Sequence, residues 1–396
     1  LNLAQQGFGV YLLEKDKVLG GVADRLHRTI EGVDVKAYLD KLIAEVTSHE
    51  GIEVLTEARI LRHLGSKGSF RTTVVTGSSP AERILQHGAV ILATGGGEHR
   101  PRGFFYGEDR RVMTQLELGE RLRADPHLAS SWERVAMIQC VGSRNPENPT
   151  CSRICCQSAV KHALELKNRA PQLDVVIFHR DVRTYGLLED YYTQARDRKV
   201  LFERFDPDRA PELVREGEKL KIKFWDAILG RTIQWPVDAV ILSAAVEAAD
   251  TGELARRLGL SQDAQGFFRE FHPKLRPVDA LMEGYYICGL AHSPRLLKEA
   301  VTQGLAAAGR AGAFLADISQ KISPLVAHVE QGRCVACLAC VRSCPYHIPR
   351  INEAGRSEIN DSLCLGCGVC ATVCPAQAIG FSHYEDEQLR AEISAL

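Results

Sequence analysis

In the first part of the chain, short runs of apolar residues alternate with segments in which apolar residues recur at the spacing of a helix. Residues 35–48 repeat apolar side chains at the spacing of a helix, and residues 1–6 resemble the end of another helix. The predicted strands are the apolar runs 10–13, 51–55, 72–76 and 89–93. Strands and helices that alternate in this way predict an α/β domain.

A second unit follows between residues 134 and 271. Residues 135–139 and 174–179 are apolar runs, and residues 158–167 between them have helical spacing. A strand–helix–strand order of this length predicts a parallel sheet. The run 238–242 predicts a further buried strand of the same sheet.

The pattern next returns to the first domain. Residues 284–288 predict a strand and residues 294–316 a long alanine-rich helix, after which residues 317–330 would link to a cysteine-rich module. We therefore expect three domains, the first interrupted by the second: residues 1–115 with 278–318, residues 133–271, and residues 331–382.

Composition excludes several classes of protein. A hydrophobic content of 45%, a charged content of 25% and a net charge of −1 are those of a globular protein, and they argue against nucleic acid or an anionic membrane as a general partner. The apolar runs are far shorter than the ~20 residues of a transmembrane helix. The chain has no signal peptide and begins with Leu1, so we expect that it lacks an upstream segment.

Cysteine is the most informative residue type. Twelve of the 13 cysteines fall into three tight groups, and only Cys288 stands alone, which favours a small buried side chain at that position. Close spacing suits metal ligation better than disulfides, and predicts a reducing, cytoplasmic setting.

Two of the groups share one motif, Cys-x2-Cys-x2-Cys-x3-Cys-Pro, near the C-terminal end. In paired ferredoxin modules the fourth cysteine of each run ligates the other [4Fe–4S] cluster. One predicted ligand set is therefore Cys334, Cys337, Cys340 and Cys374, and the other is Cys364, Cys367, Cys370 and Cys344. Two zinc sites are the alternative, but two identical runs that both close on Cys-Pro favour clusters that carry single electrons.

Several segments of the first domain predict an FAD site. Glu14, with Lys15 after it, follows a strand where a Rossmann fold places the carboxylate that binds ribose, although the glycine loop would lie ahead of Leu1. A solvated turn is the alternative for Glu14. The predicted backbone contacts are Gly20, Gly21, Ala93, Thr94, Gly95 and Gly289, and the helix that begins near Leu297 would direct its positive end at the flavin.

The third cysteine group takes the place of a nucleotide-binding glycine loop. Cys140, Cys151, Cys155 and Cys156 follow the first strand of the second unit, where the Rossmann fingerprint would stand. Four thiolates are the number that a [4Fe–4S] cluster needs. A structural zinc ion and redox-active dithiols are the alternatives.

These motifs resemble the A-type subunits of the heterodisulfide reductase family. The resemblance rests on residues 139–144 (QCVGSR), 151–156 (CSRICC) and 180–186 (RDVRTYG), and on the closing segment after the last ferredoxin motif. It implies a thioredoxin-reductase-like fold with two Rossmann-type units and FAD, followed by a ferredoxin domain with two [4Fe–4S] clusters. It assigns the third cysteine group to an extra cluster and places residues 294–308, Val301 among them, beside the isoalloxazine. Longer members carry an N-terminal cluster domain and a cysteine-bearing segment after the Gly-Gly, whereas residues 29–44 here contain no cysteine.

The resemblance also implies a function and partners. The flavin would split electron pairs, or pass them between a hydrogenase- or dehydrogenase-type donor and a pair of B/C-type subunits that reduces a disulfide. We expect an oligomeric, cytoplasmic iron–sulfur flavoprotein with no nucleic-acid partner. The alternatives are an NAD(P)H-dependent oxidoreductase of the glutamate synthase small-subunit type, which the replaced glycine loop disfavours, and a scaffold that only connects clusters.

Overall fold

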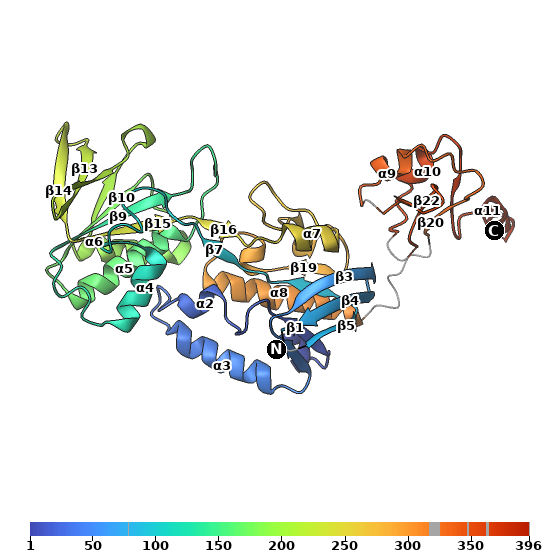
Figure 1. Ribbon diagram of the computed structural model, residues 1–396, viewed down its shortest axis with the longest axis horizontal. Coiled ribbons are helices and arrows are strands. Elements are labelled where there is room, and N and C mark those ends of the chain that lie inside the picture. Colours follow the sequence, from blue (N-terminus) through green and yellow to red (C-terminus); the bar gives the residue numbers. More distant parts are fainter. Residues whose placement is uncertain (78, 317–324, 347, 362–363, 396) are drawn as a thin grey trace.

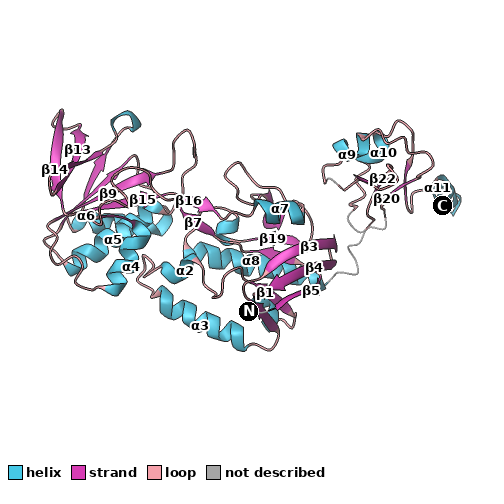
Figure 2. Cartoon of the chain, in the orientation of Figure 1, coloured by secondary structure: helices cyan, strands magenta, loops and turns pink. Residues whose placement is uncertain are grey.

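The computed structural model describes residues 1–77, 79–316, 325–346, 348–361 and 364–395. Residues 317–324 of the predicted linker lie outside the described residues. Figure 1 shows the segment after residue 324 as a body of its own, and Figure 2 shows helices and strands mixed through the whole chain. No helix of the described part is long and apolar enough to cross a membrane.

Two parallel strand pairs form the framework of the first unit. β1 (Val10–Leu13) pairs with β2 (Ile52–Leu55) through α3 (Val35–Ser48), and β6 (Val90–Leu92) pairs with β19 (Tyr285–Ile287) from far along the sequence. A strand from residues 284–288 therefore lies beside a strand of the first part of the chain. The unit also contains α1 (Asn2–Gln5), α2 (Val22–Arg25), α7 (Gly252–Leu258), β17 (Glu270–His272), β18 (Arg276–Ala280) and α8 (Leu297–Ala316).

The helix predicted at 294–316 begins later, at Leu297. The carboxylate of Glu299 accepts the backbone N–H of Leu296 at 3.0 Å, so it caps the first turn and fixes where the helix starts. Two short strands, β7 (Gly96–Glu98) and β16 (Val246–Ala248), form an antiparallel pair between the first unit and the second.

The second unit is built on a five-stranded parallel sheet. The strand order is β11-β10-β9-β15-β8, from β11 (Leu201–Arg204), β10 (Asp174–His179), β9 (Arg134–Val141), β15 (Ala239–Ala244) and β8 (Val112–Thr114). Alternate residues of β9 face opposite cores: Val135 and Met137 pack with one cluster, and Ala136 and Ile138 with the other. Because both faces are buried, these strands are continuous apolar runs, which made them predictable.

Different layers cover the two faces of this sheet. One face packs against α4 (Gln115–Ala124), α5 (Cys155–Arg169) and α6 (Glu189–Asp197). The other packs against an antiparallel sheet of β12 (Glu212–Glu216), β13 (Lys219–Asp226) and β14 (Arg231–Val237), which contributes Leu220, Ile222 and Val237 to the core. The sequence pattern did not predict this second sheet.

The C-terminal module is small and uses short elements. β20 (Ala327–Val329) pairs with β23 (Ile379–Phe381), so the strand pairing includes residues ahead of the predicted boundary at 331. The other elements are α9 (Ala339–Ser343), β21 (Arg350–Ile351), β22 (Ser357–Glu358), α10 (Val369–Thr372) and α11 (Asp386–Ala395).

A directional chain of hydrogen bonds crosses the antiparallel sheet of β3 (Arg59–Ser66), β4 (Ser69–Thr76) and β5 (Ser79–His87). The carbonyl of Ala89 can only accept, so His87 donates to it from Nδ1 at 3.0 Å and accepts from Thr72 at Nε2, 2.7 Å away. His63 then donates to Thr72 at 2.7 Å and accepts from the Tyr285 hydroxyl at 2.8 Å. Neutral imidazoles fit this chain, and burial lowers the pKa of His63 to about 4.

We expect this sheet to lose stability in acid. The pKa of His63 is about 4 when folded and 6.5 when unfolded, so the unfolded chain binds more protons below pH 6.5. Stability should therefore fall as the pH drops from 6.5 to 4, by up to about 3 kcal/mol. Hydrogen exchange of residues 59–87, corrected for intrinsic rates, measures this, and His63→Gln should flatten the dependence. A wild-type profile that is flat over this window would contradict the assignment.

Candidate iron–sulfur and flavin sites

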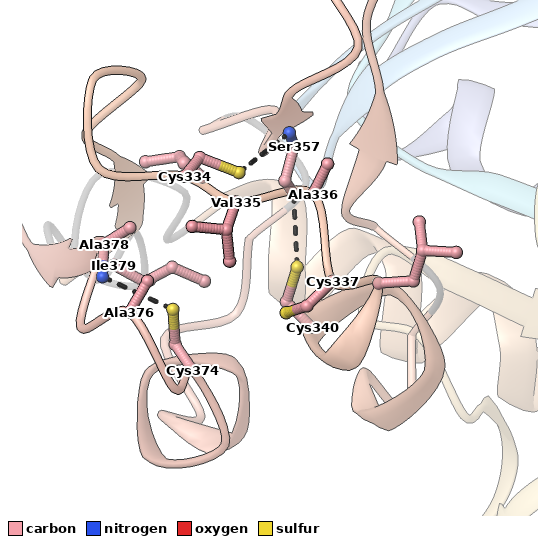
Figure 3. Close-up of a pocket in the computed structure, with 12 residues that line it drawn as sticks. Cys334, Val335, Ala336, Cys337, Cys340, Ser357, Cys374, Ala376, Ala378 and Ile379 are labelled. Carbon is pink, nitrogen blue, oxygen red and sulfur yellow. Dashed lines mark hydrogen bonds between the residues drawn. The ribbon is translucent and has the colours of Figure 1, made fainter.

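The eight cysteines of the C-terminal module surround two cavities of about 330 and 320 Å³. The first is lined by Cys334, Cys337, Cys340 and Cys374, shown in Figure 3, and the second by Cys344, Cys364, Cys367 and Cys370. The fourth cysteine of each run thus lies with the first three of the other run.

Backbone N–H groups point at several of these sulfurs. Ser357 N lies 3.4 Å from Cys334 Sγ, Ala378 N lies 3.3 Å from Cys374 Sγ, and Ala327 N lies 3.3 Å from Cys364 Sγ. The N–H groups of Ser357 and Ala336 lower the pKa of Cys334. Such donors stabilise thiolates, the form in which cysteine binds metal.

The second cavity holds its thiols close together. Burial, followed by the neighbouring thiols Cys364, Cys344 and Cys367, raises the pKa of Cys370 to about 11. An iron centre would remove that penalty by binding the thiolates. Among the described residues, no group of three or more His, Cys, Asp or Glu side chains could hold a single metal ion.

The third cysteine group comes from the end of β9, the loop after it and the helix that follows. Cys140 is the half-buried next-to-last residue of β9, and Cys155 and Cys156 lie in the first turn of α5. Burial and then the thiols of Cys156, Cys140 and Cys151 raise the pKa of Cys155, so the four thiols lie within electrostatic reach of one another. The structure therefore brings this group together.

The loop that carries these cysteines is strained. Cys140, Arg144 and Arg153 have φ angles of 64°, 57° and 60°, a region that side chains rarely occupy. Gly142 has a φ of 75°, and a Cβ there would meet His99 at 2.3 Å. The Arg153 N–H donates to Cys151 Sγ at 3.3 Å, and Cys156 Sγ lies 3.8 Å from the Asp181 carbonyl. Backbone strain of this kind clusters at functional sites.

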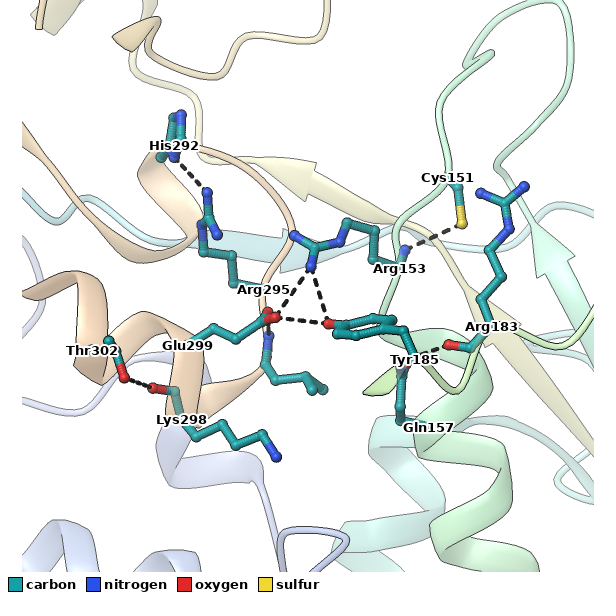
Figure 4. A network of polar contacts seen from close by, with 11 residues as sticks. Cys151, Arg153, Gln157, Arg183, Tyr185, His292, Arg295, Lys298, Glu299 and Thr302 are labelled. Carbon is teal, nitrogen blue, oxygen red and sulfur yellow. Dashed lines mark hydrogen bonds and ion pairs between the residues drawn. The ribbon is translucent and has the colours of Figure 1, made fainter. Parts of the chain in front are cut away.

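A polar network joins the cysteine loop to the first turn of α8 (Figure 4). The guanidinium of Arg153 donates to Glu299 and to the Tyr185 hydroxyl, both at 3.1 Å, and Tyr185 donates to Glu299 at 2.8 Å. Burial, followed by the hydrogen bond to Glu299, raises the pKa of Tyr185. The sequence pattern did not predict this contact. The position of Arg153 between Cys151 and Cys155 was the one available signal.

The predicted flavin contacts lie on three segments. Because β6 and β19 are parallel neighbours, Ala93, Thr94 and Gly95 lie at the same sheet edge as Gly289. Gly95 and Gly289 have φ angles of 75° and 63°, and Gly289 N–H donates to Gln303. Gly20 and Gly21 also have positive φ angles, and Gly21 precedes α2. Leu297 and Val301 lie half-buried in the first turns of α8.

One buried polar atom at this edge of the sheet has the surroundings expected of a ligand contact. Thr94 Oγ1 is buried and finds no hydrogen-bond partner among the described residues. A flavin group would satisfy such an atom. By contrast, Glu14 Oε1 accepts the N–H of Asp16 at 2.9 Å, as in a local turn, and Lys15 is exposed.

A cavity of about 650 Å³ is lined by Val22, Gly97, Leu290 and Cys155 among others. Three of these residues lie within two positions of a predicted flavin contact, but none of the ten predicted contacts is in the described lining. Glu98 in this cavity accepts from Thr114 Oγ1 at 2.6 Å, and burial raises the pKa of Glu98 to about 7. Burial also lowers the pKa of Lys161 to about 8. In both groups, burial disfavours the charged form.

Removing the Tyr185 hydroxyl tests the contact between the loop and α8. Tyr185→Phe should cost about 1–2 kcal/mol because Glu299 loses a donor, and amides at 150–156 and 183–188 should exchange roughly 5- to 30-fold faster. The matched control is Lys298→Gln, which removes an exposed ion pair with Glu31 one residue from Glu299. Equal exchange in wild type and Tyr185→Phe would show that the contact does not hold the loop.

Comparison with known proteins identifies the module and the fold. Residues 333–378 match the family of 4Fe-4S dicluster domains. The thioredoxin reductases of T. acidophilum and Lactococcus lactis are similar in structure, each with a TM-score of 0.53, at 16% and 18% identity. They cover 80% of this chain, which covers 93% and 94% of theirs. The fold is thus thioredoxin-reductase-like, with a dicluster module after it.

Sequence relatives cover the whole chain. It is 32% identical to the A-type subunit of the H(2):CoB-CoM heterodisulfide,ferredoxin reductase of Methanothermobacter marburgensis, over all of this chain and 73% of that protein. The alignment runs over 487 positions, so the relative has residues with no counterpart here. The A-type subunit of the Ferredoxin:CoB-CoM heterodisulfide reductase of Methanosarcina acetivorans is 34% identical, over 79% of this chain but 44% of that protein. The chain belongs to the family of heterodisulfide reductase A-type subunits and is an oxidoreductase subunit.

Proposed function

We propose that this chain is the electron-transfer subunit of a heterodisulfide-reductase-like complex. FAD would exchange electron pairs, and [4Fe–4S] clusters would carry single electrons towards a partner that reduces a disulfide. The observation that carries the proposal is the sorting of eight cysteines around two cavities in crossed sets. The proposed division assigns the flavin to the first unit, expected at 1–115 with 278–318, a third cluster to the second unit, expected at 133–271, and two clusters to residues 331–382. Two of these bounds differ from the structure, because β8 belongs to the sheet of the second unit and α7 packs with the first unit.

The crossed sets explain why the module would conduct electrons. Each cysteine run contributes to both cavities, so the two clusters would lie close together in one small fold. The cysteines supply all the protein ligands, and backbone N–H groups such as those of Ser357 and Ala378 would stabilise the charge on their sulfurs. This arrangement leaves no position for a substrate, which suits a relay.

The third cluster would be held by Cys140, Cys151, Cys155 and Cys156. Two observations support it: the thiols affect one another's pKa, and the loop adopts strained angles at Cys140 and Arg153. The network from Arg153 to Glu299 would keep this loop against α8, which on our proposal lies beside the flavin. Electrons could then pass between flavin and cluster over a fixed separation.

The flavin assignment rests on the segments that meet near β6 and β19. Thr94 would donate to FAD, while Ala93, Gly95 and Gly289 would let it approach the backbone. The N–H of Leu296 already donates to Glu299, so the positive end of α8 would act from Leu297 onward. Glu98, with its pKa near 7, could take up a proton nearby. The partners would be B/C-type subunits and a hydrogenase- or dehydrogenase-type donor, in a cytoplasmic complex in which the flavin could bifurcate electrons.

Iron analysis tests the number of clusters. Anaerobically reconstituted protein should hold three [4Fe–4S] clusters, about twelve iron atoms per chain. Cys151→Ser should remove about a third of the iron and leave the ferredoxin-type signals intact, because their ligands lie in another module. Cys288→Ser is the matched control, since the Cys288 thiol lies outside the three groups and is buried. About eight iron atoms together with zinc in the wild type would contradict the third cluster.

Removal of the Thr94 hydroxyl tests the flavin site. Thr94→Val keeps the shape of the side chain and removes an oxygen that lacks a partner, so the flavin-free protein should be as stable as wild type or more so. Affinity for FAD, measured by flavin fluorescence, should fall roughly 5- to 100-fold. Thr47→Val, whose hydroxyl donates to the Ile43 carbonyl of its own helix α3, should bind FAD like wild type. An unchanged affinity for FAD in Thr94→Val would show that Thr94 does not contact the flavin. A wild-type protein that assembles its clusters but binds no FAD would favour a scaffold that only connects clusters.

A further inference from the structure

Arginine side chains gather around the third cysteine group. Arg144 follows Cys140 in the strained loop, Arg153 lies between Cys151 and Cys155, and Arg180 and Arg183 follow β10. Figure 4 shows the side chain of Arg183 beside Cys151. These cations come from two loops far apart in the sequence, so folding alone brings them together.

Asp181 fixes two of these cations at the site. Its carboxylate accepts from Arg144 Nη1 at 2.6 Å and from Arg183 Nε and Nη2 at 3.2 Å. Two guanidinium groups share one carboxylate, so this triad keeps a net positive charge. Asp181 also places its own backbone carbonyl 3.8 Å from Cys156 Sγ.

Further contacts hold the backbone of the arginines. Arg180 Nη1 donates to the carbonyl of Arg144 at 2.6 Å, and Gln157 Nε2 donates to the carbonyl of Arg183 at 2.8 Å. Gln157 belongs to the first turn of α5, next to Cys156. Helix α5, the loop after β9 and the loop after β10 are therefore connected by hydrogen bonds.

The cations lie close to the sulfurs. Figure 4 shows the Arg183 side chain beside Cys151, and the carboxylate of Asp181 joins Arg183 to Arg144, which lies four residues after Cys140. The Arg144 side chain is only 19% exposed, and Coulomb interactions are stronger in such a partly buried setting than in water.

We propose that Arg144 and Arg183, held by Asp181, are positioning residues that raise the reduction potential of the cluster bound by Cys140, Cys151, Cys155 and Cys156. This inference rests on the proposed function, which places that cluster here. One-electron reduction adds one negative charge to the cluster and its thiolates, and nearby positive charge stabilises the reduced form. The electron comes from the flavin or from another protein of the complex.

The sign of the effect separates this role from a merely structural one. Removing Arg144 or Arg183 takes away positive charge and should lower the potential. Removing the charge of Asp181 takes away negative charge and should raise it. Residues that only pinned the loop would change cluster occupancy, or shift the potential in one direction whichever charge was lost.

A redox titration of the full chain followed by electron paramagnetic resonance tests the inference. Arg183→Gln and Arg144→Gln should each lower the reduction equilibrium constant roughly three- to tenfold, where tenfold is about 59 mV for one electron. Asp181→Asn should raise it, and Arg183→Lys, which keeps the charge, should stay near wild type. The two clusters of the C-terminal module provide an internal reference in every sample.

The outcomes distinguish the two proposals. Arg231→Gln, on the distant strand β14, should leave all potentials unchanged. If the paramagnetic signal of the third cluster has the same potential in wild type, Arg183→Gln and Asp181→Asn, the role of the arginines is refuted, while the third cluster itself is supported. A wild-type protein without a third signal would refute the third cluster and this inference with it. If Arg144→Gln failed to assemble, the Arg183→Gln and Arg183→Lys pair would still decide, because the Arg183 side chain is 44% exposed.

Discussion

The convergence of thiols from separate stretches of chain onto one cavity is the constraint on which this structure depends. Cys374 must lie beside Cys334, Cys337 and Cys340, and the antiparallel pairing of β20 with β23 brings the two ends of the module together for that purpose. Leu338 and Gly368 are the N-cap residues of the short helices α9 and α10, and their φ angles of 64° and 83° turn the chain tightly. A module of this size has little apolar core, so its cysteines are part of that core.

The same constraint shapes the third cysteine group, but on a different framework. There the parallel sheet fixes β9, which carries Cys140, and α5, and the loop between them must bring Cys151 to the start of the helix. To follow that path, the backbone adopts left-handed φ angles at Cys140, Arg144 and Arg153. Ser152 compensates in part, since its hydroxyl accepts the N–H of Val246 at 2.9 Å and ties the loop to β16. A dinucleotide-binding loop would use glycines at such positions, whereas here thiols and guanidinium groups need side chains.

Much of this could be predicted from the sequence because the relevant patterns are local. The run 174–179 coincides with β10 and the helical spacing at 35–48 coincides with α3, since each is decided by burial along one short segment. The crossed grouping of cysteines followed from the spacing of two repeats. The sheet β12–β14 was not predicted, because apolar and polar residues alternate only partly along its strands and many of the residues are charged. The apolar face of this sheet is defined only by its packing on the parallel sheet. The contact of Arg153 with Glu299 joins residues far apart in the chain, so the pattern of apolar and polar residues along the sequence does not predict it.

Charge and geometry act together where the second unit meets α8. Glu299 caps the first turn of that helix, accepts from Tyr185 and pairs with Arg153, so one carboxylate fixes both the helix start and the cysteine loop. Burial lowers the pKa of Arg295 nearby, and burial raises the pKa of Glu98 in the adjoining cavity. Ionised groups are therefore costly here unless they are paired. On the proposed function, each electron added to this region would interact strongly with the charges around it, because few counter-charges can rearrange. The paired arginines and carboxylates of the loop would be the charges nearest to that electron.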